Sequence, residues 1–338
     1  MAAMKSIQFL GAETIDVIEA PIPEPKEGWA RIKVSHSGIC GSDLNIYGGT
    51  HPRAIAPLIL GHEFSGTLDH DTDLMKKGTP VTVYPLISCG TCTPCCSGNS
   101  HVCNTLGLYG IDAPGGLAQY VVVPKDTIVK LPEDVSLKDG AIIEPVAVVV
   151  HAVREAGFVS GDNALVFGAG PIGLGLALTL RLYGARDLVV AENDPKRLEL
   201  ARTMGFETIN PDETDVAEFA ANKTGGDGYD NVYDCAGVSA VSMRLLDVVK
   251  VRGKIIIVAG YKKNAEMPFY KGMVKEPKIE FVRVYRRKDF EIASQIVEKE
   301  PLFSKLITHV LPVEEAQQAF DLLTTQGTGA VKVLIKFD

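Results

Sequence analysis

The chain lacks the features that would place it in a membrane or on nucleic acid. Its most apolar stretches, 141–153 and 165–182, are broken by Glu144, Pro145 and His151 and by several glycines. Neither stretch offers the roughly 20 uncharged apolar residues that a bilayer span requires. Acidic residues outnumber basic ones by 42 to 34, and the formal net charge is −8. A protein with this charge is not expected to attract the phosphates of a nucleic acid. We expect neither a membrane nor a nucleic acid among its partners.

We expect no secretory signal, and the sequence shows no internal repeat, low-complexity tract or long linker. Its 338 residues are 46% hydrophobic and 22% charged, which is typical of a soluble globular protein. The length favours about two domains of ordinary size. The function is therefore expected to reside in motifs on folded domains.

Four of the seven cysteines lie close together. Cys89, Cys92, Cys95 and Cys103 form the pattern C-x2-C-x2-C-x7-C. A structural zinc ion takes four thiolates in a closed tetrahedron, and one loop of this spacing can supply all four. Two disulfides are the alternative, but they are typical of small secreted domains, whereas this chain can bury a large core. We predict a structural zinc site in a reduced, cytoplasmic protein, in which the neighbouring Cys96 could substitute for Cys95.

Cys40 stands apart from this quartet and precedes the tripeptide Gly61-His62-Glu63. Cys40, His62 and an acidic residue would leave one position of a zinc tetrahedron vacant for water or substrate, as a catalytic zinc requires. The sequence therefore predicts two zinc ions of different kinds.

The pattern of apolar residues divides the chain into two parts. The first third is rich in predicted strands, whereas from about residue 137 strands and helices alternate, which indicates an α/β fold with a parallel doubly wound sheet. The C-terminal elements have no partners in a nucleotide-binding half and are expected to complete the first domain. Strands are expected at 29–34, 81–83, 119–123, 164–167, 187–191, 229–234, 254–258, 306–310 and 331–337, and helices at 171–183, 195–204, 238–250, 290–299 and 313–323.

A glycine-rich turn follows the predicted strand 164–167. Gly168, Gly170 and Gly173 fit the pattern G-x-G-x-x-G, and Pro171 and Ile172 lie within it where a helix begins. Glycines in this context permit a tight turn, so that a pyrophosphate can rest on the helix N-terminus. A merely flexible turn is the alternative, and the acidic residue that follows argues against it.

That acidic residue is Glu192, which lies 19 positions beyond Gly173, just past the second strand of the alternating region. Its carboxylate would accept hydrogen bonds from the adenosine ribose and repel a 2′-phosphate, so NAD is favoured over NADP. Arg197 could accommodate such a phosphate, but it sits five residues further on, in the next helix. We predict an NAD site.

Together these motifs resemble the zinc-dependent medium-chain dehydrogenase/reductase family, and in particular its sorbitol and butanediol dehydrogenase branch. The resemblance rests on Cys40-Gly41-Ser42-Asp43, Gly61-His62-Glu63, the cysteine quartet, Glu144-Pro145 and the glycine-rich turn. It implies a GroES-like β-barrel catalytic domain at 1–145 and 289–338, with the zinc lobe at about 86–106. It also implies a Rossmann domain that binds NAD at 146–288, and a homodimer or homotetramer.

The resemblance also implies roles for residues around the catalytic zinc. Cys40 and His62 match its ligands, Glu63 matches an acidic residue at or beside the metal, and Glu144 falls where sorbitol and butanediol dehydrogenases have a glutamate. Whether Glu63 or Glu144 is the third protein ligand stays open. Asp43 matches a residue that orients the zinc-bound histidine.

Proton transfer and the remaining cofactor contacts complete the expected site. Ser42 could take the hydroxyl proton of the substrate, and Asn45 stands where many relatives extend this relay with a histidine. Further contacts to the cofactor are expected at Cys235, Val258 and Gly260.

The expected activity is oxidation of a secondary alcohol to a ketone with NAD as hydride acceptor. The substrate would be a polyol, a sugar alcohol or a related hydroxy acid, with 2,3-butanediol and threonine as alternatives. A catalytically silent protein that binds NAD and zinc is the competing hypothesis. The basic run Arg283, Arg286, Arg287 and Lys288 could recognise a carboxylate or phosphate on the substrate, or be a solvated helix start.

Overall fold

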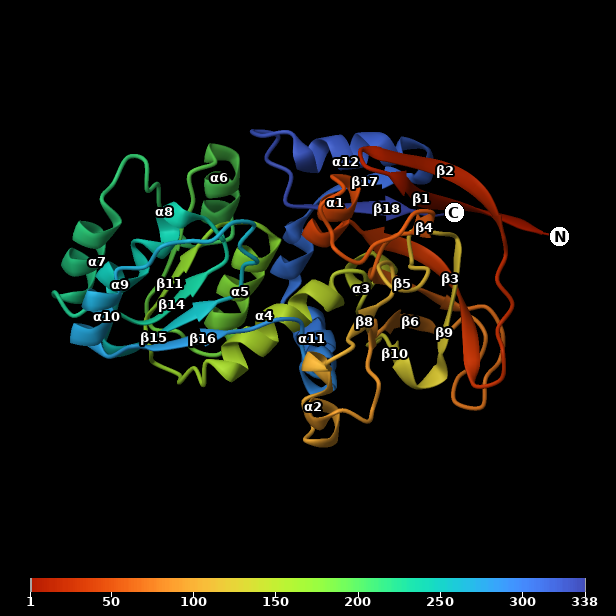
Figure 1. The fold of residues 1–338 in the computed structure, drawn as a ribbon, viewed down its shortest axis with the longest axis horizontal. Helices are drawn as coiled ribbons and strands as arrows, with labels where there is room; N and C mark the ends of the chain where they lie inside the picture. The colour runs from red at the N-terminus through yellow and green to blue at the C-terminus, as the bar shows by residue number, and fades with distance from the viewer. Residues whose placement is uncertain (1, 338) are drawn as a thin grey trace. The chain divides into compact units, whose positions relative to one another are not determined.

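A computed structural model describes residues 2–337 and divides the chain into two compact units. The first unit comprises the chain up to Ala147 together with the segment from Arg286 onward, and the second comprises Val148–Tyr285 (Figure 1). No helix in the described part of the chain is both long and apolar enough to cross a membrane.

The first unit is built mainly on β-sheet. Strand β3 (Trp29–Gly38) lies in a seven-stranded sheet and alternates buried Ala30, Ile32 and Val34 with less buried neighbours, as the period of a strand requires. The path of this sheet runs β10 (Ile128–Lys130), β6 (Pro80–Val83), β5 (Glu63–Leu68), β3, β18 (Lys332–Lys336) and β17 (Ile307–Pro312), and β9 (Tyr120–Pro124) also pairs with β3.

A second, three-stranded sheet and several short elements complete this unit. Strands β2 (Thr14–Pro21) and β4 (Leu58–Ile59) flank β1 (Ala3–Gly11), and β7 (Leu86–Ile87) pairs with β8 (Gly107–Leu108). The helices are α1 (Gly41–Tyr47), α2 (Thr93–Cys96), η1 (Ser100–Val102), η2 (Lys125–Thr127), α3 (Leu137–Gly140), α11 (Arg287–Lys299), η3 (Pro301–Leu306), η4 (Val313–Glu315) and α12 (Ala316–Thr324), and α4 (Ile143–Glu155) begins here.

The C-terminal segment lies beside the strand that leads to Cys40. Strand β18 pairs antiparallel with the end of β3, with Leu334 opposite Gly38, and β17 runs parallel to β18. The backbone amide of Ile39 continues this pairing with a 3.0 Å hydrogen bond to the carbonyl oxygen of Val333. Residues about 290 positions apart in the sequence are therefore neighbours at one end of the sheet.

The second unit contains a six-stranded sheet in which all neighbouring strands are parallel. Its strand order is β13 (Glu207–Ile209), β12 (Leu188–Ala191), β11 (Ala164–Phe167), β14 (Tyr229–Asp234), β15 (Val249–Ile257) and β16 (Lys278–Phe281). The order reverses at β11, which is where a doubly wound sheet opens a ligand crevice. Figure 1 shows α5 (Pro171–Leu182) on one side of the sheet and α9 (Leu245–Val248) and α10 (Phe269–Lys275) on the other. The predicted fold class is confirmed.

The expected helix at 238–250 is wrong in detail. The structure instead has two four-residue helices, α8 (Ser239–Ser242) and α9, and the chain enters β15 at Val249. The Ser242 hydroxyl donates to the carbonyl oxygens of Ser239, at 3.0 Å, and of Glu266, at 2.8 Å. These bonds tie the end of α8 to a distant loop. The β-branched residues Val248, Val249 and Val251 favour the extended strand that follows. The other helices of this unit are α6 (Pro195–Thr203) and α7 (Val216–Thr224).

Candidate functional site

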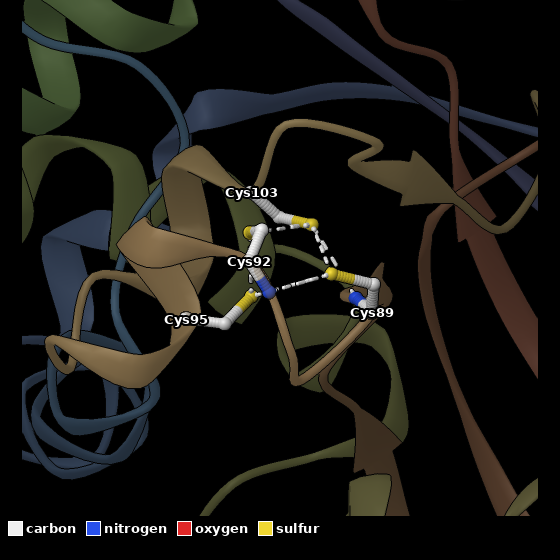
Figure 2. A group of neighbouring side chains, drawn as sticks. All are labelled: Cys89, Cys92, Cys95 and Cys103. Atoms are coloured by element: carbon white, nitrogen blue, oxygen red, sulfur yellow. Dashed lines mark hydrogen bonds between the residues drawn. The ribbon is translucent and has the colours of Figure 1, made fainter.

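Four cysteine thiols of the first unit point toward one another (Figure 2). The Sγ–Sγ distances are 3.4 Å for Cys92–Cys95, 3.5 Å for Cys89–Cys103, 3.8 Å for Cys92–Cys103 and 4.0 Å for Cys89–Cys95. A disulfide would need about 2.05 Å, whereas a tetrahedral ion with Zn–S bonds of about 2.3 Å spaces its sulfurs about 3.8 Å apart. The sulfurs therefore fit a zinc ion and not two disulfides.

Backbone amides favour the thiolate form of two of these cysteines, Cys89 and Cys103, whereas burial raises the pKa of Cys95 to about 12. The amide of Cys92 donates to Cys89 Sγ at 3.4 Å, and the amides of Cys89 and Thr105 donate to Cys103 Sγ at 3.3 and 3.4 Å. Hydrogen bonds from the backbone of Thr91 and Cys92 lower the pKa of Cys89 to about 5, and similar bonds from Cys89 and Thr105 lower the pKa of Cys103. Since the thiolate is the metal-binding form, the loop is prepared for a cation.

Cys96 lies outside the group of four. Its thiol is exposed and donates to the carbonyl oxygen of Thr91 at 3.4 Å. The geometry thus favours Cys95 over Cys96 as the fourth sulfur.

Replacing Cys95 by Ser is expected to lower the zinc content from two ions per chain to one, because a hydroxyl is a poor substitute for a thiolate ligand. The Cys96→Ser protein is the matched control and is expected to keep two ions. Elemental analysis of both purified proteins measures this. Equal zinc content in the two variants would show that Cys96 replaces its neighbour.

A second group of metal-binding side chains forms where β3 and β5 meet. Ligand atoms of Cys40, His62 and Glu63 all lie within 4.8 Å of one another. Strand pairing explains this, because Gly38 at the end of β3 stands opposite Glu63 at the start of β5. Cys40 follows as the N-cap of α1, and His62 immediately precedes β5. Two predicted ligands separated by 22 residues are thereby brought together.

The charges around His62 suit a cation. Burial alone would lower the pKa of His62, but the thiolate of Cys40 and the carboxylates of Asp43 and Glu144 raise it well above its ordinary value. Asp43 is fully buried and accepts a 2.8 Å hydrogen bond from the amide of Cys40 through Oδ2. Its Oδ1 and the Nδ1 of His62 have no hydrogen-bond partner within the described residues. A buried pocket in which several negative charges surround His62 fits a divalent ion.

Sequence reasoning missed the partner of Glu63. The Nζ atom of Lys332 lies 2.8 Å from Oε1 and 2.7 Å from Oε2 of Glu63, and the two side chains are only 3% and 1% exposed. Lysine is almost never fully buried unless it is paired. Its place among the apolar residues 331–335 was the available signal.

Glu144 is buried in the first turn of α4. It is not part of the three-residue group of metal ligands identified among residues 2–337. Its negative charge nevertheless contributes to raising the pKa of both His62 and Lys332. The carboxylate therefore belongs to the electrostatic surroundings of the group.

Ser42 and the basic run are the other residues of the first unit that were expected at the site. The Ser42 hydroxyl is buried and has no partner among residues 2–337. In the basic run, Arg286 donates to Oδ1 of Asn99 at 3.1 Å, and Arg287 donates to the carbonyl oxygen of Asp126 at 2.9 Å. These contacts within the chain favour a structural role for Arg286 and Arg287 over substrate binding.

The glycine-rich turn of the second unit has the form that a pyrophosphate needs. Gly168 has a φ of 98°, which side chains disfavour. A Cβ at Gly173 would collide with the carbonyl oxygen of Gly168. Helix α5 begins at Pro171 after the N-cap Gly170, and no side chain of residues 2–337 caps it, so its first amides are available to an anion.

Glu192 holds this turn in place. Its Oε2 accepts a 2.7 Å hydrogen bond from the amide of Ala169, and its Oε1 accepts from the amides of Asn193 and Asp194 at 2.8 and 2.9 Å. The carboxylate thus fixes the glycine-rich turn and the loop after β12 at one edge of the sheet. Glu192 also lines the cavity beside this turn.

A cavity of about 540 Å³ opens beside this turn. Among its lining residues are the expected cofactor contacts Gly168, Gly170, Glu192, Arg197 and Cys235. Burial raises the pKa of Cys235 well above its usual value, so a neutral thiol faces the cavity. Ile172, Pro171 and Gly173 lie in α5, and Val258 and Gly260 follow β15; these five are not among the lining residues.

Arg244 also lines this cavity and was not anticipated from the sequence. It lies 3.6 Å from Asp215 in an ion pair in which both side chains are half exposed. The sequence offered no signal for it, because it follows a helix whose break was not foreseen.

These geometries define a class of protein, a metal-dependent oxidoreductase that binds a dinucleotide. The alcohol dehydrogenase GroES-like domain matches residues 26–133, and the zinc-binding dehydrogenase family matches residues 171–299. The chain therefore belongs to the zinc-dependent medium-chain dehydrogenase/reductase family, and the expected family is confirmed.

Individual relatives are similar to this chain over nearly its whole length. It is 33% identical to 2-dehydro-3-deoxy-L-galactonate 5-dehydrogenase of Pseudoalteromonas atlantica over 94% of each chain. It is 34% identical to (R,R)-butanediol dehydrogenase of Bacillus subtilis, with 95% of this chain and 96% of that one covered. An alcohol dehydrogenase of E. coli CFT073, solved with NADH, is 31% identical and superposes with a TM-score of 0.91 over 100% of both chains.

The protein is accordingly an enzyme that oxidises a secondary alcohol with NAD, and zinc and NAD are its cofactors. The residues of both units fit these groups, as the sulfur spacing, the charge around His62 and the open turn at α5 show. The roles of single residues stay predictions.

Proposed function

We propose that the enzyme oxidises a polyol, a sugar alcohol or a related hydroxy acid at a catalytic zinc ion held by Cys40, His62 and Glu63. The observation that carries this assignment is the convergence of these three side chains on one point of the first unit. Three protein ligands leave the fourth position of a zinc tetrahedron to the substrate. Glu144, outside the group, acts through its charge. The quartet of Cys89, Cys92, Cys95 and Cys103 holds the structural zinc.

The chain's own groups then have distinct tasks. A bound zinc ion lowers the pKa of a hydroxyl that it contacts, and NAD accepts the hydride. The buried Ser42 Oγ, which has no partner among the described residues, receives the hydroxyl proton of the substrate. Asn45 cannot extend a relay because its amide does not titrate, so the proton leaves through Ser42 to water or the cofactor ribose. Asp43 acts on His62 through its negative charge, and its Oδ2 holds the backbone amide of Cys40.

The reaction requires a site for the alcohol and a site for NAD. We assign substrate binding to the first unit, with its GroES-like β-structure and both zinc sites, and NAD binding to the second. In the second unit Glu192 and Arg197 line the cavity beside the glycine-rich turn, and Glu192 is proposed to bind the adenosine ribose. A ribose hydroxyl can donate to a carboxylate oxygen whose remaining lone pair is unused.

A substrate panel tests the proposal. The zinc-loaded enzyme is incubated with NAD and, separately, with polyols, sugar acids bearing a secondary hydroxyl, 2,3-butanediol and threonine. Formation of NADH is followed by absorbance. We expect the highest kcat/KM for a polyol or hydroxy acid, and a lower rate with NADP than with NAD. Highest activity with butanediol or threonine would replace the proposed substrate class, as the butanediol dehydrogenase relative allows.

The competing hypothesis of a catalytically silent protein makes a different prediction. It requires two zinc ions and NADH binding without NADH formation on any substrate. Measuring zinc content and NADH binding on the same preparation therefore separates an inactive preparation from a silent protein.

We propose that the enzyme is a homodimer or homotetramer in the cytoplasm, whose reducing conditions preserve the zinc thiolates. An apolar patch on the outer strand β16 and helix α10 supports assembly, since Phe281 and Phe269 are each 79% exposed and Tyr270 is 75% exposed. Open sheet edges and apolar patches of this kind favour association.

Replacing Phe281 by Lys is expected to shift the molar mass measured by light scattering toward that of the 36.3 kDa monomer. Val159 is also exposed but lies apart from β16 and α10 in the sequence, and Val159→Lys is the control. An unchanged mass in the Phe281 variant would remove the patch from the interface.

A further inference from the structure

The buried ammonium group of Lys332 contacts one of the three proposed zinc ligands of the β3–β5 site, Glu63, and the residue that precedes another, Cys40. Besides the two oxygens of Glu63, Nζ of Lys332 donates to the carbonyl oxygen of Ile39 at 3.1 Å. Ile39 directly precedes Cys40, and Glu63 directly follows His62. Strand β18, which carries Lys332, is itself held beside β3. All three N–H bonds of the ammonium are therefore used at the metal site.

The charge of this lysine is preserved despite its burial. Burial alone would lower the pKa of Lys332, but the charges of Glu63, Cys40 and Glu144 raise it above its usual value. A buried ion pair is tolerated when hydrogen bonds satisfy both partners, and this pair meets that condition. The three hydrogen bonds thus fix the position of the ammonium beside Glu63.

The position of the Lys332 ammonium limits how Glu63 can coordinate a metal ion. The distances of 2.8 and 2.7 Å from Nζ to Oε1 and Oε2 are nearly equal, which places the ammonium on the open side of the carboxylate, between its two oxygens. A metal ion chelated by both oxygens would need this same position. Each oxygen keeps a second lone pair on its outer side, so a metal can still contact one of them.

We propose that Lys332 is a positioning residue of the catalytic metal centre, which restricts Glu63 to a single-oxygen contact and so keeps the fourth coordination position open for the alcohol. The inference rests on the proposed zinc ligands Cys40, His62 and Glu63. Without the lysine, Glu63 can chelate the ion with both oxygens, and the substrate has to displace one of them.

The test uses Lys332→Met, Lys332→Gln and Lys332→Arg in the full-length, cobalt-substituted enzyme. Visible absorption of Co²⁺ bound to a thiolate weakens when the coordination number rises, and the difference spectrum against Cys40→Ser isolates the catalytic ion from the structural one. We expect weaker bands for the Met and Gln variants and near-native bands for Arg, whose fork can occupy the same side of the carboxylate.

Kinetics of the zinc enzymes give a second readout. Changes to groups that orient metal ligands typically cost about 10–100-fold in activity or affinity, and we expect a loss of this size in kcat/KM for the alcohol, mainly through KM. The KM for NAD should stay unchanged, and Arg should restore most of the loss. Lys254→Met is the control for loss of a lysine, because within residues 2–337 Lys254 donates to the backbone carbonyls of Ala156 and Gly157 in the second unit.

The outcomes distinguish a wrong role for Lys332 from wrong zinc ligands. Native cobalt spectra and native alcohol KM in the folded Met or Gln variant would overturn the role of Lys332. If Met fails to fold, the Gln variant, which keeps one amide donor, decides the question. If Cys40→Ser leaves the wild-type cobalt spectrum unchanged, the proposed ligands themselves are wrong, whatever the lysine variants show.

Discussion

The Cys40→Ser enzyme is expected to lose alcohol oxidation by a factor of at least about 10³ while it keeps its fold. A metal that polarises a reacting oxygen supplies several kcal/mol of transition-state stabilisation, and each 1.36 kcal/mol is worth about tenfold in rate. The hydroxyl of serine does not ionise as a thiol does, so the catalytic ion is lost and the zinc content falls to one per chain. Initial rates of NADH formation and elemental analysis measure both effects.

The fold should tolerate this change. Cys40 is the N-cap of α1 and is half-buried, and serine is among the best residues at such a position. Far-ultraviolet circular dichroism and NADH binding should therefore match those of the wild type. Cys96→Ser removes a thiol outside both groups of metal ligands and should keep full activity. NAD reduction at the wild-type rate by the Cys40 variant would remove Cys40 from the metal site.

Most of the fold could be predicted because its signals are local. The apolar run 164–167 between turn residues became β11, and the alternating stretch 29–34 became the first part of β3. Helix α5 begins at Pro171 as the glycine-rich turn predicts. The helix expected at 238–250 is instead divided into α8 and α9, and Ser242 at the end of α8 donates to Glu266, 24 residues away. No local pattern encodes such a contact.

The candidate site likewise contains residues that local motifs predict and residues that only the tertiary structure brings together. The quartet and the glycine-rich turn are short-range motifs, and the structure brings their residues together. Lys332 and Glu63 are separated by 269 positions, and only the return of β18 to β3 makes them neighbours. A lysine in an apolar strand signals that an anion lies nearby, but it does not identify the anion. The proposal of Glu63 rather than Glu144 as the third ligand likewise rests on the register of β3 against β5, which places Glu63 opposite Gly38.

Replacing Glu192 by Ala is expected to raise the KM for NAD about 10–100-fold, since a hydrogen bond to a charged group contributes about 1.5–3 kcal/mol. The preference for NAD over NADP should fall at the same time, because the carboxylate no longer repels a 2′-phosphate and Arg197 lines the same cavity. Measuring kcat/KM with both cofactors at saturating alcohol gives the ratio.

Two effects contribute to this loss, and a second variant separates them. Glu192 holds three backbone amides at the glycine-rich turn in addition to its proposed ribose contact. In Glu192→Gln the amide nitrogen cannot accept from these donors, but the side chain keeps its size and loses its charge. A loss of affinity for both cofactors in Gln would indicate a disturbed turn, whereas a loss for NAD with a gain for NADP would indicate the ribose and the charge. Glu199→Ala is the control, because Glu199 is an exposed residue of α6 whose ion pair among the described residues is with Arg202 at 3.6 Å. A cofactor ratio in Glu192→Ala equal to that of this control would exclude Glu192 from cofactor selection, and Arg197 and Arg244 would then be the side chains to vary.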